Sequence, residues 1–370
     1  MQFIDLAAQQ KRIRERIETG FRKILDHGQY ILGPEIREIE EKLAAYAGVP
    51  HAVSVASGTD ALLMPLMAEN TGPGDAVFVP TFTFIASAGA VALTGATPVF
   101  VDIDPETFNI DPAKLEVTIQ KTFAAKKLTP KGIMPVDLFG QPADYESIQA
   151  IAGKYKLFVL EDAAQSFGAS QNGRKAGALA KVAGTSFFPA KPLGGYGDGG
   201  MIFTDDKAVH EELLSIRVHG QGADKYTNVR VGINGRMDSL QAAVLLAKME
   251  IFPEEIGLRQ EVAGRYDRLL AGSVTIPKIL PGNISAWAQY SVLHPRRDAV
   301  IARLREAGIP TAIYYPIPLH MQQAFAQLGY KRGDFPVAER IAGEIFSLPM
   351  HPYLEAQAQE RIAEVITGSR

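Results

Sequence analysis

Short apolar segments alternate with helical patterns through the first half of the chain. In a parallel sheet each strand is buried on both faces and is joined to the next by a crossover helix, so its strands occur as short apolar runs between helices. The alternation therefore predicts an α/β protein built on a large, mostly parallel sheet. The expected strands are His51–Val55, Ala76–Pro80, Pro98–Ile103, Ile133–Phe139, Leu157–Leu160 and Met201–Thr204, and the expected helices span 59–70, 84–94, 144–155 and 207–218.

Two further helices are predicted ahead of the sheet. Apolar side chains lie on one face of residues 9–26, and Gly28 follows where such a helix would end. Gly33 and Pro34 begin the second helix, which we expect to end at Gly48. We interpret these helices as an N-terminal arm that leads into the main domain.

The C-terminal part of the chain is predicted to form a smaller α+β domain. We place the boundary near residue 250, at the end of a long amphipathic helix over Met237–Phe252. Residues 1–250 would then form the arm and the large domain, and residues 251–370 the small one. The expected elements of the small domain are the strands Ala286–Leu293 and Thr311–Tyr315, a helix over 297–307 and two or three terminal helices.

The composition excludes several classes of function. A formal charge of −3 over 370 residues argues against nucleic-acid binding, which needs a basic surface. We expect a cytoplasmic protein, because no apolar run is long enough for a membrane span and the N-terminus lacks the apolar region of a signal peptide. The absence of cysteine removes disulfides, thiol catalysis and cysteine-based zinc sites, and the seven scattered histidines predict no metal site. We interpret the basic segment 121–131 as a surface loop.

The glycine-rich segment 185–201 holds one lysine in a restricted setting. Lys191 lies between Pro189 and Pro192, which fix the backbone on both sides, and a run of glycines follows. A positioned lysine that is removed from water has a lowered pKa and can act as a nucleophile or form a Schiff base. A structural lysine in a glycine-rich turn is the alternative, and this segment alone does not decide between the two.

Two other segments place polar groups at the ends of predicted strands. Residues 57–60, Ser-Gly-Thr-Asp, follow the first strand and begin a helix, where free N–H groups and hydroxyls would bind a phosphate. An ordinary N-cap would use the same residues. Asp162 ends a later strand, where a carboxylate can bind a metal, act as a base, pair with a protonated ring nitrogen or simply cap the next turn. Gln165 and Ser186 would add polar groups nearby.

One glycine pattern suggests a different ligand. Residues 195–200 match G-x-G-x-x-G, which is typical of dinucleotide sites. These glycines lead into a predicted strand and not into a helix, and no acidic residue follows at the expected distance. We therefore reject a dinucleotide site.

The whole set of motifs resembles one family, the sugar aminotransferases of the DegT/DnrJ/EryC1/StrS family. The resemblance implies the α/β fold of aspartate aminotransferase, which is fold type I of the transferases that use pyridoxal phosphate (PLP), and PLP as the cofactor. The likeness spans nearly the whole chain in the motifs G-Q-Y-I-L-G-P-E, S-G-T-D-A-L, P-T-F-T-F-I-A, V-F-V-D-I-D-P-E-T-F-N-I-D-P, L-F-G-Q-P-A-D, V-L-E-D-A-A-Q-S-F-G-A, S-F-F-P-A-K-P-L-G-G-Y-G-D-G-G, R-V-G-I-N-G-R-M-D-S-L-Q-A-A and Y-Y-P-I-P-L-H.

The resemblance also assigns roles around the cofactor. Lys191 would bind PLP as a Schiff base and then move a proton as general acid and base. Asp162 would pair with the ring nitrogen and keep it protonated, so that the ring accepts electrons. Phe84 would stack on the ring, and Gln165 would lie close to it. The phosphate would be bound by Gly58, Thr59 and Ser186, and by Asn234 from the neighbouring subunit of a homodimer with shared active sites.

The likeness extends to the substrate. The motifs most resemble enzymes that use glutamate to aminate C3 of a UDP-linked 2-acetamido-3-keto-glucuronic acid for O-antigen sugars. Arg236 would bind the sugar carboxylate, because a guanidinium matches that group; a salt bridge to Asp238 or a packing role is the alternative. Tyr314 and Tyr315 would contact the substrate, although the subfamily tends to have histidine where this chain has Tyr314.

Two alternatives stay open at this point. A dTDP-linked 3- or 4-keto-6-deoxysugar is the alternative substrate. A protein that keeps the fold for binding or regulation without catalysis is the alternative from another class, and the intact Lys191 and Asp162 argue against it. A dehydratase is disfavoured, because such enzymes of this fold have histidine in place of the lysine.

Overall fold

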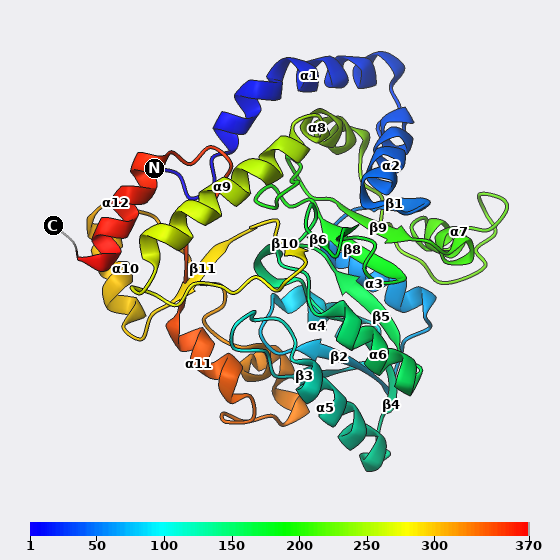
Figure 1. Cartoon of the computed structure of the whole chain (residues 1–370). Helices are drawn as coiled ribbons and strands as arrows, with labels where there is room; N and C mark the ends of the chain where they lie inside the picture. The colour runs from blue at the N-terminus through cyan, green and yellow to red at the C-terminus, as the bar shows by residue number, and fades with distance from the viewer. Residues whose placement is uncertain (369–370) are drawn as a thin grey trace.

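A seven-stranded sheet lies at the centre of the computed structural model, which describes residues 1–368 (Figure 1). The strand order is β1-β9-β8-β5-β4-β2-β3, and β9 is antiparallel to both of its neighbours while the other pairs are parallel. The carboxyl ends of all strands but β9 therefore meet at one edge of the sheet. The strands are β1 (His51–Val55), β2 (Asp75–Pro80), β3 (Thr97–Val101), β4 (Thr129–Ile133), β5 (Phe158–Asp162), β8 (Val182–Ser186) and β9 (Gly200–Thr204).

Helices cover both faces of this sheet. Successive residues of β2 belong to different cores: Phe78 packs with α2, α5 and α6, whereas Val77 and Val79 pack with α3, α4 and α7. This alternation is what a strand buried on both faces requires. Within residues 1–368, no helix combines the length and the apolar character that a bilayer span requires. The helices of this part are α1 (Leu6–His27), α2 (Pro34–Ala47), α3 (Gly58–Ala68), α4 (Ile85–Leu93), α5 (Pro112–Ala125), α6 (Tyr145–Tyr155), α7 (Lys207–Ile216) and α8 (Ser239–Met249).

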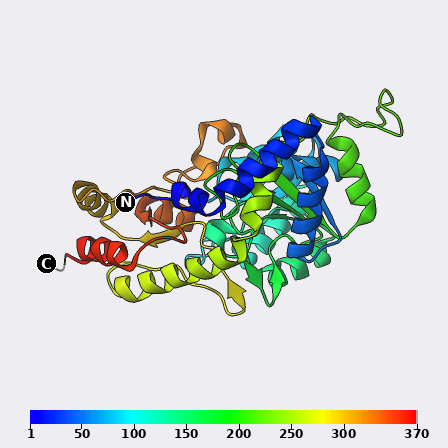
Figure 2. The ribbon, with the colours of Figure 1, turned by 90° about the horizontal axis from the view of Figure 1, so that it is seen from above.

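A third core lies at the other end of the molecule (Figure 2). It contains Tyr266, Tyr290 and Phe346, and it is enclosed by a two-stranded sheet of β11 and β12 and by three helices. The division of the chain at residue 250 stays a prediction. The remaining elements are α9 (Phe252–Leu270), α10 (Arg297–Glu306), α11 (Pro336–Glu344), α12 (Ala356–Thr367), β11 (Tyr290–Leu293), β12 (Ile345–Leu348), the small sheet of β6 (Ser170–Gln171), β7 (Arg174–Lys175) and β10 (Asn283–Ile284), and the 3-10 turns η1 (Leu138–Gly140), η2 (Leu319–Met321) and η3 (Gln323–Leu328).

The structure corrects the sequence expectation around the fourth strand. The strand is Thr129–Ile133, and the apolar residues that follow it up to Phe139 are buried without forming a strand. The segment 121–131, predicted as a surface loop, contains the end of α5 and the start of β4. A polar strand was missed here because only the last residues of β4 are buried.

Three further expectations differ from the structure. Residues 311–315, predicted as a strand, make only one isolated bridge, between Ala312 and Ser347. The strands β8 and β12 were not predicted. The helix expected over Met237–Phe252 ends at Met249, and α9 begins at Phe252.

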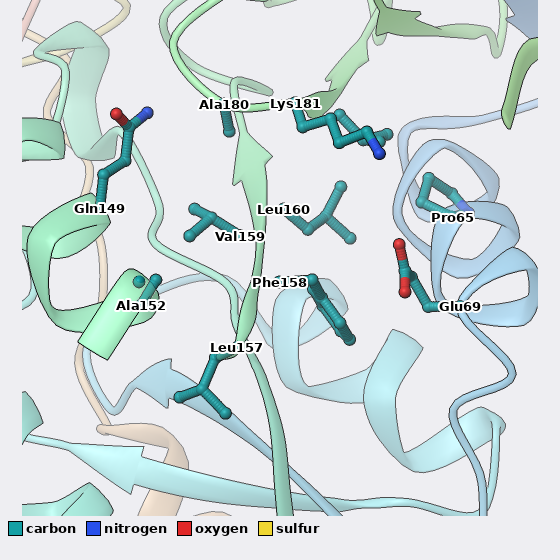
Figure 3. A pocket seen from close by; sticks show the side chains of 12 residues that line it. Pro65, Glu69, Gln149, Ala152, Leu157, Phe158, Val159, Leu160, Ala180 and Lys181 are labelled. Carbon is teal, nitrogen blue, oxygen red and sulfur yellow. The ribbon is translucent and has the colours of Figure 1, made fainter. Parts of the chain in front are cut away.

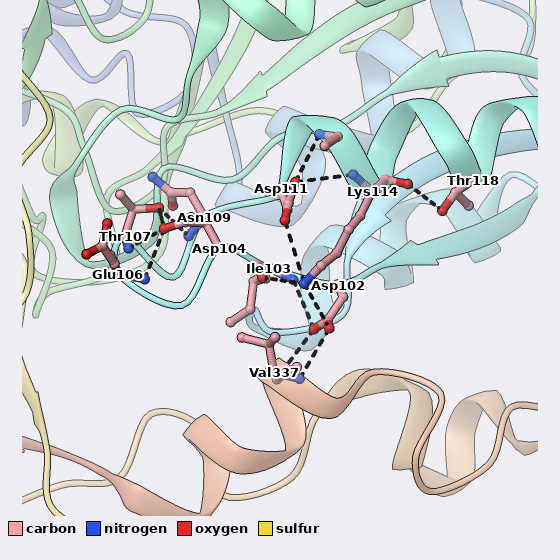
Figure 4. Close-up of polar contacts among 12 residues, drawn as sticks. Asp102, Ile103, Asp104, Glu106, Thr107, Asn109, Asp111, Lys114, Thr118 and Val337 are labelled. Atoms are coloured by element: carbon pink, nitrogen blue, oxygen red, sulfur yellow. Dashed lines mark hydrogen bonds and ion pairs between the residues drawn. The ribbon is translucent and has the colours of Figure 1, made fainter.

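Asp102 joins the sheet to the C-terminal part of the chain (Figure 4). This buried carboxylate follows β3 and accepts hydrogen bonds from the N–H groups of Val337 (3.2 Å) and Ala338 (3.0 Å) at the start of α11. It also pairs with Nζ of Lys114 at 3.2 Å. Because Phe335 precedes α11 without capping it, Asp102 serves as the N-cap from a distant part of the sequence.

We expect Asp102→Ala to lower the free energy of unfolding by about 2 kcal/mol, because the substitution leaves the first turn of α11 uncapped and removes one of the partners of the Lys114 amine. Urea unfolding followed by circular dichroism measures this change. Lys114→Met is the matched control: Lys114 is partly exposed, so it should cost less than about 1 kcal/mol. Equal costs for both variants would contradict the capping role.

Candidate active site

The carboxyl edge of the sheet encloses a cavity of about 400 Å³. It is lined by residues that follow β1 and β2, by the ends of β5 and β8, and by the loop between β8 and β9. This is the edge at which open α/β sheets bind ligands. Nine predicted site residues line the cavity, namely Gly58, Thr59, Phe84, Asp162, Gln165, Ser186, Lys191, Tyr314 and Tyr315.

The N-terminus of α3 forms one wall of this cavity. The Oγ of Ser57 accepts the N–H of Asp60 at 3.1 Å, so the N-cap interpretation is correct for this residue. The first intrahelical bond is donated by Ala61 to the carbonyl of Ser57, which leaves the N–H groups of Gly58 and Thr59 ahead of it. A Cβ on Gly58 would lie 2.6 Å from Cβ of Ser186, so glycine is required for the close approach of α3 to β8. The cap and the anion-binding arrangement therefore coexist.

Asp162 carries a buried carboxylate at the end of β5. Its Oδ2 accepts the hydroxyl of Ser87 at 2.7 Å, and its Oδ1 accepts the N–H of Ala164 at 3.2 Å. Burial raises the pKa of Asp162, and the two hydrogen bonds together with the charge of Lys191 oppose that rise. The carboxylate is thus held in one orientation, and its negative charge is only partly compensated. A cationic partner in the cavity would stabilise it.

Lys191 supplies the amine. Its backbone N–H donates to the carbonyl of Phe188 at 2.9 Å, and a Cβ on Gly194 would lie 2.5 Å from the carbonyl oxygen of Pro189, so the turn is tight. Burial lowers the pKa of Lys191, and the carboxylate of Asp162 opposes that fall. An amine in this setting is more readily deprotonated than a free lysine, as nucleophilic attack requires.

Gln165, Tyr314 and Tyr315 line another part of the cavity. The Nε2 of Gln165 donates to the hydroxyl of Tyr315 at 3.1 Å, and its Oε1 accepts the N–H of Phe139 at 2.7 Å. The ring of Phe84 is exposed and lies 6.1 Å from the ring of Tyr315. Tyr314 lies beside it, with its ring 5.8 Å from that of Tyr315. These contacts leave an apolar ring face at the mouth of the cavity.

Two predicted residues do not line the cavity. Asn234 and Arg236 follow a loop that protrudes beyond α7 and exposes Tyr226 and Val231 (Figure 1). The Nε of Arg236 is buried and has no partner among residues 1–368. Asp238 does not bind it, since its carboxylate caps α8 by accepting the N–H of Gln241 at 2.9 Å.

Comparison with known proteins identifies the family. The model of the DegT/DnrJ/EryC1/StrS aminotransferase family matches residues 11–367. The chain belongs to this family. The aminotransferase is 50% identical to UDP-2-acetamido-2-deoxy-3-oxo-D-glucuronate aminotransferase of Pseudomonas aeruginosa over 100% of both chains. The fold type and the aminotransferase class expected from the sequence are thereby confirmed.

Solved structures agree with this assignment. The crystal structure of a DegT DnrJ EryC1 StrS aminotransferase from Brucella abortus has 50% sequence identity and a TM-score of 0.97, and the match covers 100% of this chain and 99% of that one. NtdA from Bacillus subtilis, determined with bound cofactor PMP, has 30% identity and a TM-score of 0.88, with coverage of 99% of this chain and 82% of that chain. The aminotransferase fold thus extends over the whole described chain.

Sequence reasoning missed two residues of this aminotransferase site. Ser87 binds Asp162 from the first turn of α4, and its spacing of three residues from Phe84 was an available signal. Gln289 lines the cavity from just before β11, and no motif marked it, because it is brought there by the packing of the C-terminal segment.

We expect Asp162→Asn to lower the pKa of Lys191 further in the ligand-free aminotransferase, because the substitution removes the carboxylate that opposes the effect of burial. The amine should then become reactive at a lower pH. The pH dependence of reductive methylation at Lys191, followed by mass spectrometry, measures the shift, with the exposed Lys207 as the internal control. An unchanged profile at Lys191 would mean that the two groups are not electrostatically coupled.

Proposed function

We propose that this aminotransferase moves an amino group from glutamate to the C3 keto group of UDP-2-acetamido-2-deoxy-3-oxo-glucuronic acid. The observation that carries the proposal is the full-length identity of 50% to an enzyme named for this substrate, together with a cavity that holds Lys191 and Asp162. The product would be a diamino-uronic acid building block for O-antigen or another surface polysaccharide.

PLP is the cofactor, and the residues of the cavity fit it. The N-terminus of α3 with Ser186 would hold the phosphate, since its N–H groups and hydroxyl converge where a Cβ would otherwise fill the space. The buried carboxylate of Asp162 would pair with the ring nitrogen, and the amine of Lys191 would bind the aldehyde. Gln165 and Phe84 would line the ring.

The chain's own groups would perform the proton transfers. When bound, PLP supplies an aldehyde that takes the amino group and a ring that accepts the electron pair left when a C–H bond breaks. The Nζ of Lys191 would remove the proton from Cα of the amino donor and later deliver one to C3 of the sugar. Its lowered pKa supports this exchange, because a neutral amine is needed to take a proton. Ser87 would hold the Asp162 carboxylate in place throughout.

The sugar carboxylate would be bound by Arg236, whose buried Nε has no hydrogen-bond partner among residues 1–368. Tyr314 and Tyr315 at the mouth of the cavity would contact the sugar or its diphosphate. A dTDP-linked 3- or 4-keto-6-deoxysugar has less support as the substrate. A catalytically silent protein of this fold also has less support, because the groups needed for catalysis share one cavity.

The position of Asn234 supports a homodimer with shared active sites. Asn234 is exposed and lies outside this chain's own cavity, at the base of a loop that carries the exposed side chains of Tyr226, Val229 and Val231. Exposed apolar side chains on a protruding loop are typical of an interface. In the homodimer this loop would cross to the other subunit and place Asn234 on the phosphate there.

We expect Lys191→Ala and Asn234→Ala each to lose most activity alone, and a mixture of the two refolded together to regain it. If Lys191 and Asn234 come from different subunits, each mixed dimer contains one intact site and one doubly altered site, so the mixture should approach about a quarter of the wild-type activity. Glutamate-dependent turnover measures the recovery. A mixture that stays inactive would contradict shared sites.

A substrate panel tests the sugar assignment. We expect the wild-type enzyme to prefer the UDP-linked uronic acid over its neutral UDP-linked counterpart, and Arg236→Ala to lower kcat/KM for the uronic acid by about 100-fold while leaving the neutral sugar nearly unchanged. Arg236→Lys should restore only part of this loss. Equal losses on both sugars would assign Arg236 a packing role, and preference for a dTDP-linked deoxysugar would overturn the proposed substrate.

A further inference from the structure

Gln289 is a cavity residue with an uncommitted carboxamide. It lines the same cavity as Lys191 and Asp162, and its Oε1 is buried with no hydrogen-bond partner among residues 1–368. Of the described residues that line this cavity, it is the only one with such a buried, partnerless side-chain atom. A buried amide without a partner is costly, so proteins rarely keep one unless a ligand or water completes it.

The backbone of Gln289 is fixed close to the reacting groups. Its N–H donates to the carbonyl of Phe139 at 3.4 Å, and the N–H of Phe139 in turn donates to Oε1 of Gln165 at 2.7 Å. The next residue, Tyr290, is fully buried in the third core and binds the carboxylate of Asp267 at 2.6 Å. The side chain of Gln289 therefore starts from a rigid base, beside the residue that orients Gln165.

Several other polar side chains of the cavity are already paired. Gln165 uses both ends of its carboxamide, with Tyr315 and Phe139. Ser87 binds Asp162, and the hydroxyl oxygen of Ser186 accepts the N–H of Phe188 at 3.2 Å. Gln289 differs from these groups because its buried Oε1 has no partner among residues 1–368, and it can therefore recognise a neutral hydrogen-bonding substituent.

The proposed reaction limits which substituent this is. The keto carbon C3 must meet the amine of Lys191, so the groups on the adjoining ring carbons must lie within the same cavity. The substituent on C2 is an acetamido group, whose amide N–H donates and whose carbonyl accepts a hydrogen bond. A carboxamide can serve either end of that amide. We propose that Gln289 binds the 2-acetamido group of the nucleotide sugar and selects for it over a 2-hydroxyl.

This inference rests on the proposed function and goes beyond it by assigning a specificity residue. A hydroxyl at C2 is shorter than an acetamido group and does not reach as far into the cavity wall. A sugar with a 2-hydroxyl would leave the carboxamide of Gln289 unpaired, and a site built for an absent group disfavours such a ligand.

The experiment runs the reaction in reverse with the holoenzyme, with the stable amino-sugar product as the amino donor and 2-oxoglutarate as the amino acceptor. UDP-2-acetamido-3-amino-2,3-dideoxyglucuronic acid and its 2-hydroxy counterpart are reacted with the wild type and with Gln289→Met, a substitution of similar shape without hydrogen-bonding groups. We expect Gln289→Met to lower kcat/KM for the acetamido sugar by about tenfold, mainly through a higher KM. It should leave the 2-hydroxy sugar unchanged. Gln289→Asn, which keeps the amide but withdraws it by one methylene, should give the same pattern.

Gln149→Met is the matched control. Gln149 lies on α6 and lines a separate cavity beside the beginning of β5, at the opposite end of that strand from Asp162 (Figure 3). This variant should behave as the wild type towards both sugars. Dissociation constants of the amino sugars for Lys191→Ala, with and without Gln289→Met, separate binding from turnover and should show the same selective loss.

The outcomes separate this inference from the proposed function. Equal losses on both sugars, or no loss on the acetamido sugar, would overturn the role of Gln289 while the wild-type turnover still supports the proposed function. A wild-type enzyme that converts neither amino sugar would overturn the proposed function and this inference with it.

Discussion

The attraction between the carboxylate of Asp162 and the amine of Lys191 governs the whole site. Burial disfavours the charged form of both groups, raising the pKa of the acid and lowering that of the amine, while each charge partly restores the other. Neither group would be useful in the same way at the surface, where water would fix both charges. The large sheet and its helices are needed because they exclude water around a carboxylate at the end of β5 and an amine in the loop between β8 and β9.

The reversed strand β9 explains how the amine reaches the acid. Because β8 and β9 are antiparallel neighbours, the loop between them begins and ends at the edge where the parallel strands end. Lys191 lies in this loop, and Asp162 ends β5, the neighbour of β8 on its other side. Gly58 then permits α3 to approach Ser186 closely. A fully parallel sheet would have needed a long crossover at this point and would have left less chain at the edge.

Local pattern was enough to predict the sheet, its carboxyl edge and the strand-end groups of the cavity such as Asp162, because strand ends converge by geometry, whereas Phe84, Tyr314 and Tyr315 were expected only from the family resemblance. Local pattern failed where an apolar segment is buried without being a strand, and where a strand is polar. Val136 and Phe139 are apolar because they are buried next to the cavity and in the core, not because they form a strand, whereas the true strand β4 is polar at its exposed end. Gln289 could not be placed, since the packing of the C-terminal segment brings it to the cavity, whereas the spacing of Ser87 from Phe84 was a signal that was not used.

Two regions of the chain, far apart in sequence, build the cavity wall. The acid and the amine belong to the region before residue 205, whereas Gln289, Tyr314 and Tyr315 are brought in by residues after 285. The later region packs on its own aromatic core and is tied to the sheet by the carboxylate of Asp102. Substitutions in these late segments can therefore change one part of the cavity wall while Asp162 and Lys191 stay as they are.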